Sequence, residues 1–207
     1  GNFLNLVVSA EGYVDYVETF NVDADKTIDV VLERVKSTMV ITASDYNISI
    51  TTAVFSLYDG ETPVIENVTA NEDGKYVFTL TGALNPDGYT LKGTAPYFNA
   101  YECQVKVNDS FSSYPCLMYG ESVNRTVYLS EHKLTLVATV LDNEQNYVTN
   151  ATLSFAYPED AGVSYVRNAV NNNDGTYTFN EIRASVAADK ACIVTCSVPE
   201  MKEIEPA

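Results

Sequence analysis

The sequence has no Trp and one His, and its 12 basic residues are outnumbered by 28 acidic ones. A hydrolase built on a nucleophile and a base needs a His or an equivalent base near the nucleophile. His132 instead stands beside Lys133 between two similar segments, where a solvated linker residue is expected. One imidazole and four Cys without C-x-x-C spacing also supply too few ligands for zinc. The sequence therefore predicts no catalytic residue and no enzyme.

Basic clusters and long apolar runs are also missing. A net charge of −16 repels phosphate backbones and anionic lipid headgroups. No apolar run reaches the ~20 residues of a membrane-spanning helix, and no charged-then-apolar leader opens the sequence. We therefore expect neither nucleic-acid binding nor membrane insertion.

The acidic residues that are present fall mainly in turns. Turn geometry accounts for Asp73, Asp87 and Asp174 better than a glycosidase carboxylate pair does. Calcium is the cation that the loops Asp23–Asp25 and Asn172–Asp174 would suit. Neither loop has the full ligand spacing of a known calcium loop, so no cofactor is predicted.

The composition favours β-structure. Tyr, Val and Thr are abundant, 46% of residues are apolar and only 19% are charged, a balance that suits half-buried pleated surfaces. One small sandwich needs about 100 residues, so 207 residues indicate roughly two domains.

Internal repeats are the most informative feature. The stretch from Val8 to Val22 matches the stretch from Gly93 to Val107 at a constant spacing of 85 residues. An Asp-Gly motif also recurs, as residues 71–78 and 172–179, before alternating aromatic residues. Asp-Gly in this setting predicts a hairpin, because Gly adopts the positive φ of a tight turn. Opening strands are expected at 38–42 and 134–138, and second strands at 53–57 and 151–155.

These repeats resemble the carboxypeptidase-regulatory-like, transthyretin-like and collagen-adhesin B-type repeats of cell-surface proteins. The residues that carry the resemblance are Asp73-Gly74-Lys75-Tyr76, Asp174-Gly175-Thr176-Tyr177, Ser9-Ala10-Glu11-Gly12-Tyr13 and Thr27-Ile28-Asp29-Val30-Val31-Leu32. The resemblance implies tandem immunoglobulin-like (Greek-key) β-sandwich domains that serve as spacers, stalks or adhesins without chemistry of their own.

Sequons and cysteines bear on the compartment. Acceptor sequons occur at Asn47, Asn67, Asn108, Asn124 and Asn150, a mild excess that indicates an exported glycoprotein. An insertion of twelve residues in the central repeat contains Cys116. A disulfide with Cys103 on the preceding strand would pin that insertion to the sandwich. Cys192 and Cys196 lie on one face of a predicted strand, too far apart to bond, and are expected to be buried.

The repeat boundaries divide the chain into a partial repeat at 1–33, a sandwich at 34–130 and a sandwich at 131–207 that lacks its last strand. Either the chain is part of a longer tandem array, or copies complete one another by strand addition. An apolar strand pair in residues 1–33 needs a cover, which favours the second interpretation. The strand-exchange candidates are the alternating residues Thr27, Ile28, Val30 and Leu32.

The function predicted is that of an extracellular structural protein, a subunit of a pilus-like surface fibre that polymerises head to tail. The alternative is a carbohydrate- or protein-binding adhesin module from a longer tandem-repeat surface protein. Fifteen Tyr would suit a glycan ligand, but Trp is absent and the Tyr occupy strand positions where packing explains them.

Overall fold

A computed structural model describes residues 3–45, 48–111, 113–157, 166–187 and 192–199 of the chain. The described elements are strands, apart from one helical turn, α1 (Ala184–Ala187). Contacts divide the chain into two compact units, residues 1–130 (unit 1) and residues 131–207 (unit 2). The all-β fold predicted from the sequence is confirmed.

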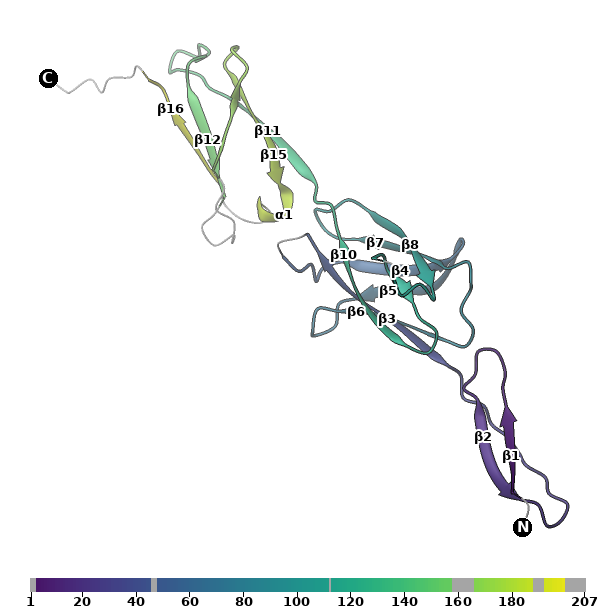
Figure 1. Cartoon of the computed structure of the whole chain (residues 1–207). Helices are drawn as coiled ribbons and strands as arrows, with labels where there is room; N and C mark the ends of the chain where they lie inside the picture. The colour runs from purple at the N-terminus through teal and green to yellow at the C-terminus, as the bar shows by residue number, and fades with distance from the viewer. Residues whose placement is uncertain (1–2, 46–47, 112, 158–165, 188–191, 200–207) are drawn as a thin grey trace. The chain divides into compact units, whose positions relative to one another are not determined.

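Unit 1 begins with an antiparallel hairpin of β1 (Phe3–Val8) and β2 (Tyr16–Asn21) (Figure 1). Six residue pairs join the two strands, from Phe3 opposite Asn21 to Val8 opposite Tyr16. No second sheet covers this hairpin among the described residues. Several of its apolar side chains are consequently more than half exposed, namely Phe3 at 75%, Leu4 at 51%, Val7 at 57% and Val17 at 64%.

The rest of unit 1 is a sandwich of two sheets. Its strands are β3 (Lys36–Ser44), β4 (Val54–Asp59), β5 (Thr62–Thr69), β6 (Tyr76–Thr81), β7 (Tyr89–Thr94), β8 (Tyr101–Val107), β9 (Cys116–Leu117) and β10 (Ser122–Tyr128). One sheet has the order β10-β3-β6 and the other the order β5-β4-β7-β8-β9. Alternate side chains of both sheets point inward and share one core.

Strand β3 is central to the smaller sheet. It pairs in parallel with β10 and antiparallel with β6. Because both of its edges are occupied and the second sheet covers one face, Met39, Ile41 and Ala43 are completely buried. Val127 of β10 is only 2% exposed. The core of the sandwich therefore depends on β10 as much as on β3.

Unit 2 is a smaller sandwich. Its strands are β11 (Lys133–Thr139), β12 (Thr152–Ala156), β13 (Val166–Asn168), β14 (Val170–Asn171), β15 (Thr176–Arg183) and β16 (Ile193–Ser197). The two sheets have the orders β11-β15-β14 and β13-β12-β16. Phe155, Tyr157, Tyr177 and Phe179 are the largest side chains of its core.

The Asp-Gly turns place Gly74 and Gly175 at positive φ, +71° and +88°, as the turn chemistry predicts. In unit 2 the turn closes a hairpin between β14 and β15. The hairpin predicted in unit 1 is wrong, because β5 and β6 belong to different sheets. There the turn carries the chain from one layer of the sandwich to the other.

A buried Tyr follows each Asp-Gly turn and ties two loops together. The hydroxyl of Tyr76 accepts a hydrogen bond from the Ala53 amide at 3.1 Å and donates one to the Ile50 carbonyl at 2.9 Å. Tyr177 makes the matching pair of bonds in unit 2, both 2.9 Å long. The sequence repeat is thus also a repeat of hydrogen bonds, which makes the strands of the two units directly comparable.

Candidate strand-exchange site

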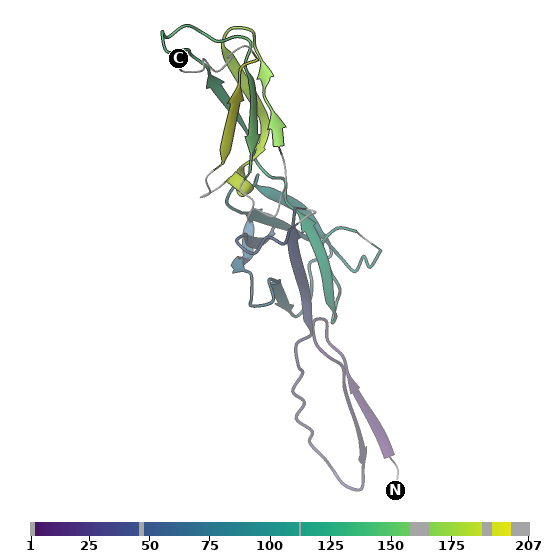
Figure 2. The same ribbon diagram turned by 90° about the vertical axis from the view of Figure 1, so that its left-hand side faces the viewer.

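Residues 22–33, which contain the strand-exchange candidates, form an extended segment that belongs to no sheet. Figure 2 shows it running back past the β1–β2 hairpin as an unpaired stretch. Ile28, Val30 and Leu32 are half-buried, whereas Val31 is 87% exposed. None of the backbone hydrogen bonds found among the described residues involves residues 22–32. The segment therefore has the side-chain alternation of a strand but lacks a partner strand.

Residues 1–33 repeat the last strands of the unit 1 sandwich. Tyr16 on β2 and Tyr101 on β8 are 85 residues apart, and each faces the preceding strand in the same register. Strands β1 and β2 are thus counterparts of β7 and β8. Leu32 and Leu129 are 97 residues apart, which makes residues 27–32 the counterpart of residues 124–129, the last five residues of β10 and the Leu that follows it.

Unit 2 has an open edge where unit 1 has β10. Leu136 of β11 faces Phe179 just as Met39 of β3 faces Phe78, so β11 is the counterpart of β3. Strand β3 lies between β10 and β6, whereas β11 pairs only with β15 among the described residues. As a result Leu136 is 38% exposed and Leu134 is 48% exposed, although Met39 is completely buried.

A second edge is open where unit 1 has β8. Cys196 of β16 faces Leu153 as Gly93 of β7 faces Phe55, so β16 is the counterpart of β7. Strand β7 pairs with both β4 and β8, whereas β16 pairs only with β12 in the described part of unit 2. All five residues of β16 are exposed, including Ile193 at 62%. The described part of unit 2 therefore has no strand at two positions for which residues 1–33 hold matching sequences.

The predicted disulfide between Cys103 and Cys116 is not formed. Both residues are free thiols. Cys116 lies opposite Lys106 in the parallel pairing of β9 with β8, three residues beyond Cys103. Three strand residues span ~10 Å, more than the ~7 Å between Cα atoms that a disulfide tolerates. Complete burial of Cys116 and Leu117 holds the insertion in place instead.

The other cysteine predictions have mixed outcomes. Cys192 is half-buried against the unit 2 core. Cys196 is exposed, contrary to the expected burial, because β16 pairs with β12 on one edge only and no described strand lies along its other edge. Burial raises the pKa of the Cys103 thiol. This thiol is therefore protonated at neutral pH and is a weak nucleophile.

Four sequons lie on the described surface. Asn67, Asn108, Asn124 and Asn150 are all exposed, so each is accessible to a glycan. Asn47 lies outside the described residues. Asn108 also accepts a hydrogen bond from the Tyr119 amide at 3.0 Å, which fixes the loop that carries it.

A buried ion pair that the sequence did not reveal lies at the start of unit 2. Arg183 Nε donates to Glu131 Oε2 at 2.6 Å, and the Ser185 amide and hydroxyl both donate to Glu131 Oε1, the amide at 2.8 Å. Burial pushes the pKa of Glu131 upward, but the hydrogen bonds from Ser185 and Arg183 outweigh it and leave that pKa below its usual range. Glu131 and Arg183 are 52 residues apart, so no local motif could have linked them. The carboxylate is fully engaged and anchors α1 to β11.

A hollow of about 400 Å³ lies over the outer face of β4 and β7, lined among others by Tyr58, Lys92 and Glu102. Tyr58 gives this hollow an aromatic side chain, the kind of surface on which the glycan of the alternative function would stack. However, the Lys92 ammonium lies 5.3 Å from the centroid of the Tyr58 ring and 3.7 Å from Glu102 Oε2. The aromatic face is thus already occupied, and it is not free to stack on a sugar.

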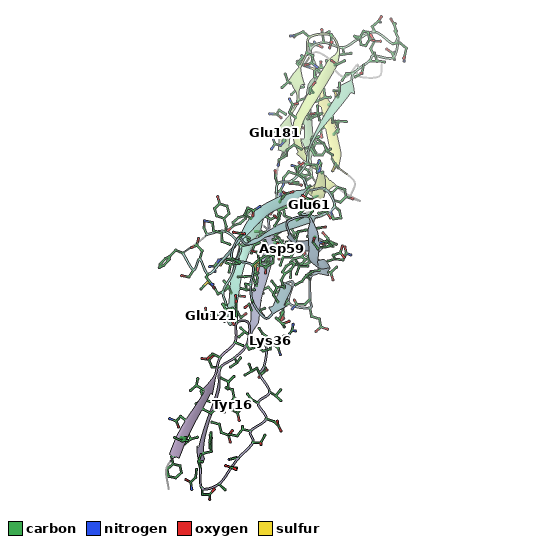
Figure 3. The ribbon with its side chains drawn as sticks, turned by 90° about the vertical axis from the view of Figure 1, so that its right-hand side faces the viewer. Tyr16, Lys36, Asp59, Glu61, Glu121 and Glu181 are labelled. Atoms are coloured by element: carbon green, nitrogen blue, oxygen red, sulfur yellow. The ribbon has the colours of Figure 1, made fainter. Side chains whose placement is uncertain are left out.

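Within the described residues, no three His, Cys, Asp or Glu side chains come together to hold a metal ion. In unit 1 the labelled side chain of Glu121 lies apart from those of Asp59 and Glu61 (Figure 3). Asp174, one of the calcium candidates, accepts hydrogen bonds from the amide and hydroxyl of Thr176, which lower the pKa of that carboxyl.

The described part of the chain also contains no helix long and apolar enough to span a membrane.

Two sandwich units with matching Tyr tethers define a tandem, all-β repeat protein. Among solved structures, the chain is similar to the Bacillus anthracis TIE protein, with 21% sequence identity and a TM-score of 0.53 over 84% of this chain. At this identity the likeness shows the fold alone. The matched region is 32% of that protein chain, so the present chain spans about a third of its length. No family model matches the sequence, and no curated protein matches it.

Proposed function

We propose that the chain is an extracellular structural protein whose copies join head to tail into a filament by strand complementation. One observation carries this proposal: among the described residues β11 and β16 have no partner strand at the positions that β10 and β8 occupy in unit 1, and the N-terminal segment contains counterparts of both strands. Donor and acceptor therefore reside in the same chain. A contact between two different surfaces of one molecule need not close, and so it propagates.

The energetic reason for joining is the apolar surface on both sides of the contact. Leu134 and Leu136 of the acceptor remain 48% and 38% exposed, and Ile28, Val30 and Leu32 of the donor are only half-buried. Burial of apolar surface contributes about 25 cal/mol per Å². Pairing also satisfies backbone groups along β11 that have no strand beside them. The exposed sequons are consistent with a place outside the cell, where such a filament would act as a fibre or stalk.

The donor segment supplies its own matched control. Val30 is half-buried and Val31 is exposed, so we expect Val30→Asp to abolish assembly and Val31→Asp to leave it intact. The reason is that an unpaired carboxylate at position 30 would be buried in the acceptor, at a cost of several kcal/mol. Sedimentation velocity and negative-stain microscopy of the full chain over a range of concentrations measure the outcome. A chain that stays monomeric at every concentration, or equal effects of the two substitutions, would contradict the proposal.

A further inference from the structure

Resting on this proposed function, we further propose that the donated element is residues 27–32 alone. In this proposal the segment adds in parallel to β11 of a second copy, with Thr27 opposite Val137, while β1 and β2 of the donor stay paired with each other. This assigns one partner, one edge and one register to the contact.

The choice of residues 27–32 over β2 follows from which backbone groups are free. Strand β2 is engaged with β1 through six residue pairs, and β2 uses for them the same edge that β8 uses to pair with β7. Donating β2 to β16 would therefore break a complete ladder before another could form. Residues 27–32 have no strand partner to give up, so their addition only creates hydrogen bonds.

The register follows from the pairing of β10 with β3 in unit 1. There Asn124 lies opposite Val40, and the two strands run parallel. Thr27 precedes Asn124 by 97 residues, and Val137 follows Val40 by the same spacing. The counterpart of the pair Asn124–Val40 is therefore the pair Thr27–Val137. Thr27 is exposed and Val137 is 57% exposed, so this pair points away from the core.

The side chains that would enter the acceptor also match. Val127 and Leu129 of unit 1 are 2% and 3% exposed, at the edge of the sandwich core. Val30 and Leu32 hold the same places in the donor segment and bring the same apolar side chains. By the same offset Val30 falls opposite Val140, which is partly buried against the unit 2 core, and we expect Val30 and Leu32 to become buried at this end of the β11 edge.

The donor segment also has counterparts of the hydrogen bond that ends the β10–β3 ladder and of the four-residue spacing from Leu129 to the next strand. In unit 1 the Leu129 amide donates to the Ser44 carbonyl at 2.8 Å, and the corresponding bond would join the Leu32 amide to the Leu141 carbonyl. Lys36 opens β3 four residues after Leu32, and Lys133 opens β11 four residues after Leu129. The donor chain would thus continue from the completed unit with the same spacing that already links unit 1 to unit 2.

A cross-linking experiment tests the register in the full chain. One variant carries Thr27→Cys and a second carries Val137→Cys, so that any disulfide between these positions joins two molecules. Paired Cα atoms on adjacent strands are ~4.8 Å apart, within the range of a disulfide. We expect the mixture to give a covalent dimer on mild oxidation, with the 27–137 bond identified by non-reducing peptide mapping, which also separates it from products of the native thiols. The matched control replaces Val137→Cys by Lys133→Cys, which lies ~13 Å along the same face of β11 and should give no such dimer.

The outcomes separate this inference from the function on which it rests. A 27–137 bond without a 27–133 bond supports the register. If the unmodified chain assembles by sedimentation but 27–137 fails to form, or 27–133 forms instead, the register is wrong and the filament proposal stands. If the unmodified chain does not assemble at all, both proposals fall.

Discussion

The hydroxyl of Tyr76 provides a test of the tether that the two units share. Tyr76→Phe removes one oxygen and leaves the Ala53 amide and the Ile50 carbonyl without their partner. Tyr76 is completely buried, and its ring packs edge-on against Phe55 with centroids 4.8 Å apart, so the ring itself should stay in place. Each buried polar group left unpaired costs about 1–3 kcal/mol. With two such groups, we therefore expect unit 1 to lose at least about 2 kcal/mol of unfolding free energy.

Tyr177→Phe is the corresponding change in unit 2, where the same two kinds of hydrogen bond are lost. The two units have separate cores, so each substitution should lower the unfolding transition of its own unit. For domains of this size, 1 kcal/mol shifts the melting temperature by roughly 4–8 °C. The expected loss therefore corresponds to a shift of at least roughly 8 °C in one transition.

Differential scanning calorimetry and urea unfolding of the full chain measure both transitions. The control is Tyr147→Phe, because Tyr147 is 65% exposed and its hydroxyl makes no hydrogen bond among those found in the described residues. This substitution should change stability by less than about 0.5 kcal/mol. If Tyr76→Phe and Tyr177→Phe change stability no more than Tyr147→Phe does, the hydroxyls do not tie the loops together and the reasoning is refuted.

Glu131→Gln should cost unit 2 about 3–5 kcal/mol at neutral pH, because it removes the buried carboxylate charge that Arg183 and Lys133 face at 2.6 and 3.8 Å. The pKa of Glu131 is lowered by folding, so its contribution is full above the unfolded value of ~4.3 and is lost as pH falls through the lower folded value. Urea unfolding between neutral and acidic pH should consequently show a weaker acid dependence in the variant, and an unchanged dependence would count against the ion pair. Gly175→Val should destabilise unit 2 by more than about 1–3 kcal/mol, because φ is +88° and an added Cβ would lie 2.6 Å from the Tyr147 side chain. Gly74→Val should cost unit 1 less, since its nearest neighbour is a methyl group of Thr51 at 3.2 Å; thermal melts that rank the two in the opposite order would contradict this.

The sequence alone determined the class of fold and the positions of several strands. Period-2 alternation and Asp-Gly turns are local signals, and they placed strands at 38–42, 53–57, 134–138 and 151–155, where the structure has β3, β4, β11 and β12. The spacing between Tyr16 and Tyr101 likewise aligned strands that the structure pairs in one register. These features depend on residues close together in the chain or on direct repetition, which is why they could be predicted.

Only the tertiary structure decided which strands meet, because pairing between distant segments leaves no local trace. The sheet order shows that the Asp-Gly turn of unit 1 connects strands of different sheets rather than a hairpin. The register of β9 on β8 places Cys116 opposite Lys106, too far from Cys103 for a disulfide. The burial of Glu131 against Arg183 depends on two segments that carry no common motif. Above all, the repeats could show that β11 corresponds to β3, but only the three-dimensional arrangement showed that, within the described part of the chain, β11 has a partner strand on one edge only and exposes its apolar side chains.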